Sequence, residues 1–437
     1  MEHSRIQAAS DGARGDASLG ARLLLVLLAA APFIFALSTW NPGLEHRPLQ
    51  DWSRSLWIPV LLIEAIALFG ALRLGARPLS MLEGQSFCLN AALAALVGLA
   101  LATATAVAAQ PQLALVRTLG TLLHLGLALS LASLFASGWN TLSSRVWPLL
   151  VLGTCALLPV IALYVAAIPD PARFDWENFW LAGSNVRQLG FYCVVGAAGA
   201  LGLAEGAADR RRYLLWTLAA TSMIALACWS GTRSALIAAA LSFALGFATL
   251  PALRSRQVLA AAFISFAGGA LLSLTLAPPS HLYGITRMVE TTAQPVAGPA
   301  GGVGSGRVEM WLGTIQTILE RPFFGHGAGQ FRFVVEEAGA RYSHPHNLFL
   351  QLLVEWGVAG TLLFLSLAVP LWWRFHRAVR DGGADLLPAF LVVNGLIALS
   401  MIEGALYHPW PVMIAAIGFA FVLTSQPASA AAAPATG

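Results

Sequence analysis

Long apolar runs dominate this chain of 437 residues, and they constrain its fold more than any other feature. Hydrophobic residues fill 57% of the positions and charged residues only 11%, which excludes a water-soluble domain of ordinary composition. A helix needs about twenty apolar residues to cross roughly 30 Å of hydrocarbon. We therefore expect an all-α polytopic membrane protein with about twelve transmembrane helices, near 22–40, 56–73, 87–109, 112–137, 146–168, 186–204, 214–230, 234–250, 258–277, 347–373, 386–405 and 409–425.

Two regions among these runs have alternative interpretations. The first follows a charged leader, but no later segment resembles a mature secreted domain, so we interpret it as a retained span rather than a cleaved signal peptide. The short pair on either side of Gly231-Thr232-Arg233 is also compatible with one broken helix.

The arginines predict the orientation, because short cytoplasmic loops are enriched in positive charge. With the N-terminus inside, only five arginines fall in short external segments: Arg47, Arg54, Arg173, Arg187 and Arg233. Fourteen fall on the cytoplasmic side: Arg5, Arg14, Arg22, Arg73, Arg77, Arg145, Arg210, Arg211, Arg212, Arg254, Arg256, Arg374, Arg377 and Arg380. This distribution predicts an even number of spans, with both termini cytoplasmic.

One long polar segment, 278–345, interrupts the apolar pattern, and the same topology places it outside the membrane. Residues 1–277 would then hold the first nine helices, residues 346–425 the last three, and residues 426–437 a disordered tail. Within the long loop, 307–319 is expected to form an amphipathic helix that places Met310, Ile315 and Leu319 near one another, with Trp311 and Ile318 alongside.

Two histidines, His344 and His346, end this loop directly before an apolar run. A neutral imidazole exchanges protons near neutral pH, so either residue is a candidate general base. The alternative is structural, with Asn347 or His346 capping the helix that follows and Pro345 stiffening its start. The pair has no third ligand at a recognisable spacing, so a metal site is not expected.

Three arginines stand at membrane depth or its border. Arg117 lies inside an apolar run and is expected to pair with a buried carboxylate such as Glu64, Glu355 or Glu403. Arg187 and Arg233 fall on the predicted external face, where positive charge is disfavoured. One guanidinium group can donate two parallel hydrogen bonds to phosphate oxygens. We therefore expect an anionic ligand there, with snorkelling to the interface as the alternative.

Other polar features give weaker candidates. Asp175 and Glu177 could hold a divalent cation, but such a pair is more often solvated. His124 is expected to be a satisfied core residue, whereas Arg341, Asn347 and His408 could line a site and His326 could approach a ligand. The cysteines lie in apolar runs and suggest neither disulfides nor zinc. Neither a cofactor motif nor a nucleic-acid module is found, so no cofactor and no nucleic-acid partner are expected.

Four motifs together resemble the signature of bacterial O-antigen ligases and the related O-antigen polymerases. They are Gly231-Thr232-Arg233-Ser234, Arg307-x-x-x-Trp311, Pro322-x-x-Gly325-x-Gly327-x-Gly329-x-Phe331, and His344-x-His346-Asn347-x-x-Leu350-Gln351-x-Leu353-x-Glu355-x-Gly357-x-x-Gly360.

The resemblance implies a GT-C type glycosyltransferase of the bacterial inner membrane with a periplasmic active site. It would transfer polysaccharide from undecaprenyl pyrophosphate to lipid A–core without metal or ATP. It assigns the catalytic role to His346 and pyrophosphate contacts to Arg233 and Arg307, and it matches His344 and Arg187 less securely.

Several functions stay open at this point. A polymerase would extend the polysaccharide, and a protein O-oligosaccharyltransferase would glycosylate serine or threonine. The lack of a large extra C-terminal soluble domain favours the ligase over protein-glycosylating relatives. An ion-coupled transporter built around Glu64, Arg117, Glu355 and Glu403 is the alternative from another class, and a non-catalytic scaffold is also possible.

Overall fold

The computed structural model describes residues 2–43, 56–83, 85–179, 181–281, 283–285, 307–338 and 342–424, with the side chains of 2–18, 140, 141 and 384 excluded. These residues form helices and turns, and no strand occurs among them. The protein is an all-helical, multi-pass membrane protein. Arg341, the glycine- and proline-rich segment 295–306 and the tail 426–437 lie outside the described residues.

Each of the twelve predicted apolar runs corresponds to a helix or a helix pair. The helices in these runs are α1 (Glu2–Ser38), α3 (Ile58–Arg73), α5 (Phe87–Ala106), α6 (Pro111–Ala136), α7 (Asn140–Cys155), α8 (Leu157–Ala166), α9 (Leu189–Glu205), α10 (Arg210–Trp229), α11 (Arg233–Thr249), α12 (Arg256–Leu274), α16 (Leu348–Arg380), α17 (Leu387–Ser400) and α18 (Pro409–Thr424).

The connecting segments hold α4 (Ser80–Glu83), α14 (Arg307–Glu320), α15 (Phe331–Val334) and five short 3₁₀ turns, η1 (Val186–Gln188), η2 (Pro251–Arg254), η3 (Glu336–Ala338), η4 (Ala384–Leu386) and η5 (Ala405–Tyr407).

Length and composition distinguish two groups among the helices of the apolar runs, and α3 and α10 belong to neither. Among the described residues, seven helical stretches are long and apolar enough to cross a membrane, and α11, α17 and α18 are shorter apolar helices. α10 and α11 are separate helices joined at Gly231, whose φ of +67° permits the tight turn. Of the two interpretations of this region, the hairpin is therefore confirmed.

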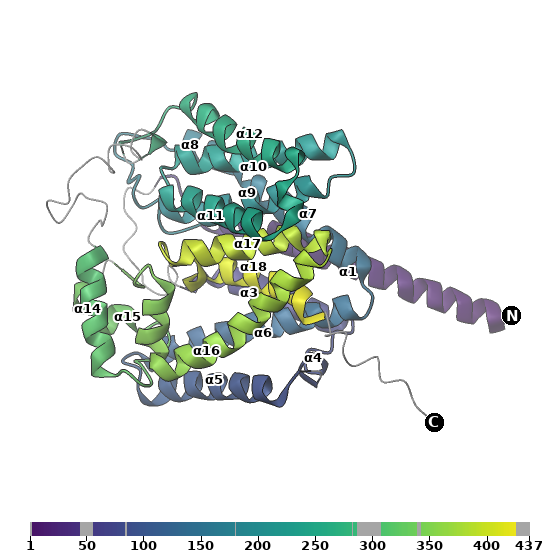
Figure 1. The fold of residues 1–437 in the computed structure, drawn as a ribbon, viewed down its shortest axis with the longest axis horizontal. Coiled ribbons are helices and arrows are strands. Elements are labelled where there is room, and N and C mark those ends of the chain that lie inside the picture. The colour runs from purple at the N-terminus through teal and green to yellow at the C-terminus, as the bar shows by residue number, and fades with distance from the viewer. Residues whose placement is uncertain are drawn as a thin grey trace.

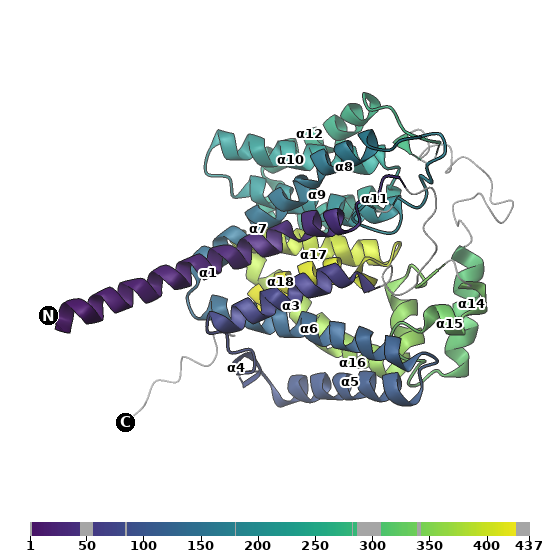
Figure 2. The ribbon, with the colours of Figure 1, turned by 180° about the vertical axis from the view of Figure 1, so that it is seen from behind.

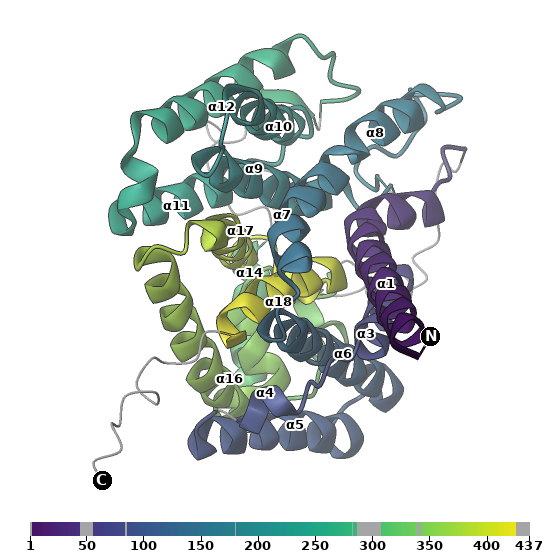
Figure 3. The same cartoon turned by 90° about the vertical axis from the view of Figure 1, so that its right-hand side faces the viewer.

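The bundle has two groups of helices with a central layer between them. Viewed along the spans, α8 to α12 form one group, α3, α5, α6 and α16 form the other, and α7, α17 and α18 lie between (Figure 3). α9 packs against α7, α10, α11 and α17 and is the most deeply buried span. Burial of an apolar helix on all sides requires an apolar circumference, which its sequence provides.

Helix α14 crosses one end of this bundle, with its axis across the spans, and the N-terminus lies at the opposite end (Figures 1 and 2). The helix forms where the sequence predicts it, but the grouping of its apolar residues was wrong. Met310 is buried against the protein, whereas Ile315 and Leu319 are exposed. At 100° per residue these positions fall on opposite faces. α14 is therefore apolar on its inner and its outer face.

Candidate active site

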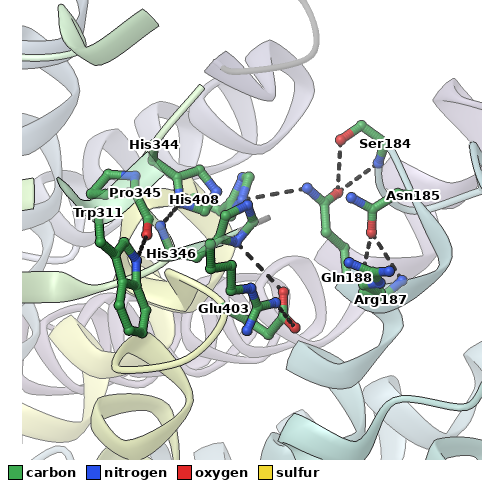
Figure 4. A network of polar contacts seen from close by, with 11 residues as sticks. Ser184, Asn185, Arg187, Gln188, Trp311, His344, Pro345, His346, Glu403 and His408 are labelled. Atoms are coloured by element: carbon green, nitrogen blue, oxygen red, sulfur yellow. Dashed lines mark hydrogen bonds and ion pairs between the residues drawn. The ribbon is translucent and has the colours of Figure 1, made fainter. Parts of the chain in front are cut away.

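The predicted site residues come from separate segments, and Figure 4 shows Arg187, His344, His346 and His408 in one network of polar contacts. His344 and His346 precede α16, Arg307 begins α14, Arg187 lies in η1 and Arg233 begins α11. The turn between α17 and α18 completes the group with Glu403 and His408, neither of which the sequence placed at its centre.

Glu403 joins two of the predicted residues. Arg307 Nη2 donates a hydrogen bond to Glu403 Oε1 at 2.7 Å, and His346 Nδ1 lies 3.5 Å from Glu403 Oε2. The exposed fractions of the three side chains are only 15%, 9% and 14%. Buried charges are tolerated when they are paired in this way. The carboxylate therefore links a candidate base to a candidate phosphate ligand.

The electrostatics keep Glu403 ionised. Burial by itself raises the pKa of the carboxyl group, but contact with His346 and the charges of Arg307 and Arg187 outweigh it. The net result is a pKa well below the usual range for glutamate. A permanent negative charge beside Nδ1 favours the proton on that nitrogen. His346 Nε2 is then the nitrogen available to accept a proton from a substrate.

His344 has a different environment. Its ring is buried, and its Nδ1 accepts a hydrogen bond from the backbone N–H of His346 at 3.2 Å. Burial, followed by the neighbouring His346, His408 and Arg117, lowers its pKa well below the usual value. Gly404, with φ +63°, packs against this ring, and any Cβ there would collide with it. His344 is thus neutral and supports the backbone of His346.

The backbone at His346 is unusual. Its φ of +53° lies in the left-handed region, which few residues other than glycine adopt and which clusters at functional sites. Trp311 Nε1 donates to the carbonyl of Pro345 at 2.7 Å, and Asn347 caps α16 by accepting from Phe349 N and Leu350 N. The capping role predicted as an alternative for Asn347 is confirmed. These contacts fix the imidazole in place.

Arg187 and Arg233 remain available for a ligand. Within the part of the chain that the structure describes, neither guanidinium has a hydrogen-bond or ion-pair partner. Arg233 lies close enough to Arg187, Arg307 and Glu403 to interact with all three electrostatically. Three cations and one anion leave a net positive cluster, which is the requirement for binding an anion. Asn185 holds η1 in place by accepting from Arg187 N and Gln188 N.

His408 lies behind this cluster. Its buried ring packs against Trp57 at 4.9 Å and Phe191 at 5.1 Å between ring centroids, and Gln188 Nε2 lies 3.4 Å from its Nε2. Burial, followed by the charges of Arg117 and His346, lowers its pKa well below the usual value. The His408 ring therefore packs behind the ring of His344. Its direct contact with a substrate stays a prediction.

The competing candidates have structural partners. His124 Nδ1 pairs with Glu64 at 2.7 Å, which confirms that His124 is a satisfied core residue. His326 Nε2 contacts the carbonyl of Thr317 at 3.0 Å. Among the described residues no group of three or more potential metal ligands occurs.

Two further predictions concern Asp175 and Arg117. Asp175 accepts hydrogen bonds from the backbone and the side chain of Asn178. Arg117 donates to the Tyr407 carbonyl at 2.9 Å and stacks over the Tyr407 ring at 3.9 Å, and it interacts electrostatically with Glu355. The sequence predicted pairing with a buried carboxylate, and the structure shows direct contacts with Tyr407 together with this electrostatic interaction with Glu355.

Glu403 is the central residue whose role the sequence analysis missed. It appeared among the carboxylates expected to pair with a buried arginine and in the transporter alternative, and its partners are Arg307 and His346. Gln188 and Trp311 were not assigned roles in the site either. The available signal was weak, since it consisted of one acidic residue at the end of an apolar run.

Comparisons with known proteins agree with the motifs. Residues 218–365 match the family model described as O-antigen ligase. A curated protein of Pseudomonas aeruginosa named O-antigen ligase is 32% identical over 142 residues, which cover 32% of this chain and 33% of the relative. The chain thus aligns with about a third of the length of that relative. The resemblance to O-antigen ligases drawn from the motifs is confirmed over the region compared.

Proposed function

We propose that this protein transfers O-antigen polysaccharide from undecaprenyl pyrophosphate to a sugar hydroxyl of lipid A–core. The observation that carries the proposal is the placement of His346, backed by the Glu403 carboxylate, beside Arg187, Arg233 and Arg307. This arrangement combines a base for an alcohol with cations for a pyrophosphate leaving group. The match to O-antigen ligases supports the same substrates.

In the proposed reaction the acceptor hydroxyl attacks the anomeric carbon of the donor sugar. A new C–O bond forms to the acceptor as the bond between the anomeric carbon and the pyrophosphate oxygen breaks. His346 Nε2 takes the hydroxyl proton, and Glu403 stabilises the imidazolium that forms. Attack opposite the leaving group predicts inversion of the anomeric configuration. General-base help of this kind contributes about 10² to 10⁴-fold in rate.

The arginines would stabilise the charge that develops on the leaving pyrophosphate. Arg187 and Arg233 have free guanidinium groups within the described structure, and each can donate two parallel hydrogen bonds to phosphate oxygens. Arg307 is anchored by Glu403, which fixes its position before the donor binds. Such preorganised cations supply charge stabilisation without a metal ion. We therefore propose metal-independent catalysis.

The topology that follows is also a proposal. About twelve spans of a GT-C type fold would place both termini in the cytoplasm and the α14 end in the periplasm. A periplasmic site has no access to cytoplasmic nucleotide sugars. A polyprenyl pyrophosphate in the bilayer brings its own activated bond to such a site, which accounts for the choice of donor.

The test is reconstitution of the purified full-length protein with lipid-linked polysaccharide and lipid A–core in detergent, with and without a chelator. We expect a covalent polysaccharide–lipid A–core product in both conditions, and its loss in His346→Ala. Arg233→Ala should lose activity, whereas Arg173→Ala should not, because Arg173 is an exposed arginine paired with Asp170.

Each other outcome identifies another function. Polymer growth without transfer to lipid A–core would indicate a polymerase, and glycosylated protein would indicate an O-oligosaccharyltransferase. No covalent product at all from a folded sample would refute the enzymatic proposal and favour the transporter or the scaffold.

A further inference from the structure

Helix α16 contains a break within its apolar run. Gly357 has φ +62° and ψ −167°, a combination that only glycine adopts readily. In a regular helix Val358 N would bond to Val354 O, and Ala359 N would bond to Glu355 O. The break separates these partners and leaves two donors and two acceptors without their helical bonds.

The segment 322–327, which follows α14, provides a hydrogen-bond partner for each of these four groups. Two of its carbonyls accept from the freed N–H groups, and two of its own N–H groups donate to the freed carbonyls. The bonds are Val358 N to Pro322 O at 2.8 Å, Ala359 N to Phe323 O at 3.0 Å, His326 N to Val354 O at 2.9 Å and Gly327 N to Glu355 O at 2.8 Å.

Glycines make this close approach possible. A Cβ on Gly357 would collide with the backbone of Phe323, and a Cβ on Gly325 would lie 2.6 Å from the carbonyl of Glu355. The segment therefore packs backbone against backbone with the broken helix. We call residues 322–327 the plug segment.

The break lies at membrane depth. Because α16 is kinked at Gly357, its length is counted from the break: the 15 residues after Gly357, up to Trp372, rise about 22 Å at 1.5 Å per residue, which is less than the roughly 30 Å of hydrocarbon. Trp372 and Trp373, followed by Arg374, mark one interface. Counting back about twenty residues from there reaches position 353. Gly357 then falls inside the hydrocarbon layer, and tilting of the helix would place it deeper.

Backbone groups in lipid must be bonded within the protein, since no water is present to satisfy them. The plug segment meets this requirement for α16. Two of its side chains are exposed, Phe323 at 69% and Phe324 at 59%, and Leu319 at the end of α14 is 70% exposed. They continue an apolar surface that includes Val358 and Leu362 on α16, which are also exposed.

We propose that the plug segment is re-entrant, so that Leu319, Phe323 and Phe324 contact lipid acyl chains in the leaflet on the α14 side. The long loop is then rooted in the bilayer rather than lying wholly in water. Because α14 begins at Arg307, which is bonded to Glu403, this anchor sets the height of Arg307 relative to the lipid headgroups. The proposal concerns location and does not depend on the function proposed above.

The experiment places single cysteines in a chain whose four native cysteines are replaced by alanine. Phe323→Cys and Phe324→Cys are labelled with bimane and reconstituted in nanodiscs. Quenching by bromine-labelled lipid chains is compared with quenching by aqueous iodide. Leu362→Cys on α16 is the lipid control, and Glu336→Cys, an exposed residue of the same loop, is the water control.

We expect bromolipids to quench positions 323 and 324 at least threefold more strongly than position 336, and close to the level at position 362. Iodide should show the reverse order. Strong iodide quenching at 323 and 324 with no bromolipid effect would overturn the proposal. If a cysteine variant fails to fold, a photocrosslinking phenylalanine analogue at position 323 in the otherwise native chain tests the same contact with lipid. Crosslinks to lipid support the re-entrant segment, and folded protein with none refutes it.

Discussion

Replacing Glu403 by glutamine removes the charge behind His346 and changes little else in shape. A glutamine side chain still accepts a hydrogen bond from Arg307 through its amide oxygen. Its amide NH₂, however, would face His346 Nδ1 and favour a proton on Nε2 instead. The imidazole would then present a donor to the acceptor hydroxyl, when it needs to present a lone pair.

The expected loss follows from the distance. Two unit charges 3.5 Å apart attract by about 5 kcal/mol at an effective dielectric constant of about 20. If the proton is half transferred in the transition state, about 2 kcal/mol of stabilisation disappears, which is roughly thirtyfold in kcat. The wrong tautomer adds to this loss, up to about 10⁴-fold where a buried carboxylate orients a catalytic histidine. Glu403→Gln should fall between these limits.

The assay separates orientation from a general loss of folding. Transfer rates and binding of the lipid-linked donor are measured for Glu403→Gln, Glu403→Asp and a control, Asp170→Asn, which changes an exposed carboxylate. We expect kcat to fall in Glu403→Gln with donor binding unweakened, because Arg307 loses a competing anion. Glu403→Asp should recover part of the rate. A variant that transfers at the native rate, or that loses donor binding with kcat intact, would refute the reasoning.

Four further predictions concern the same region. His346→Ala should reduce transfer by about 10² to 10⁴-fold with donor binding retained, measured by single turnover. Arg233→Ala should weaken both donor binding and transfer. Arg233→Lys should restore only part of the donor affinity, because lysine lacks the planar guanidinium group, and titration with donor measures this. Gly357→Ala should lower the melting temperature, because its φ of +62° and the Phe323 backbone leave no room for a methyl group; the neighbouring Val358→Ala is its control. The melting temperature of the native protein should fall as pH drops below about 6.5, because burial lowers the pKa of His408, so only the unfolded chain takes up the proton. His408→Phe should reduce the matching pH dependence of the unfolding free energy by up to about 1.4 kcal/mol per pH unit.

The fold was predictable to a large extent because hydrocarbon imposes simple rules. Every predicted apolar run corresponds to helix, and the amphipathic segment 307–319 is α14. Backbone groups in lipid have few alternatives to helix, so the composition and length of an apolar run suffice to predict a helix there. The inner and outer faces of α14 were not separated, since both faces are apolar and its neighbours cannot be read from periodicity alone.

The candidate site was predictable only in part. The sequence proposed His344, His346, Arg187, Arg233 and Arg307, and the structure brings these residues together at one end of the bundle. It did not show that Glu403 joins two of them, because that contact spans 96 positions between Arg307 and Glu403. Long-range partners of this kind depend on how helices pack.

The strain at the site is compensated by the contacts around it. His346 holds a left-handed backbone, and it does so because His344 Nδ1 accepts its N–H while Trp311 holds the Pro345 carbonyl. Trp311 lies on α14, whose other end leads into the plug segment on α16. The position of the imidazole therefore depends on the same helix that carries Arg307.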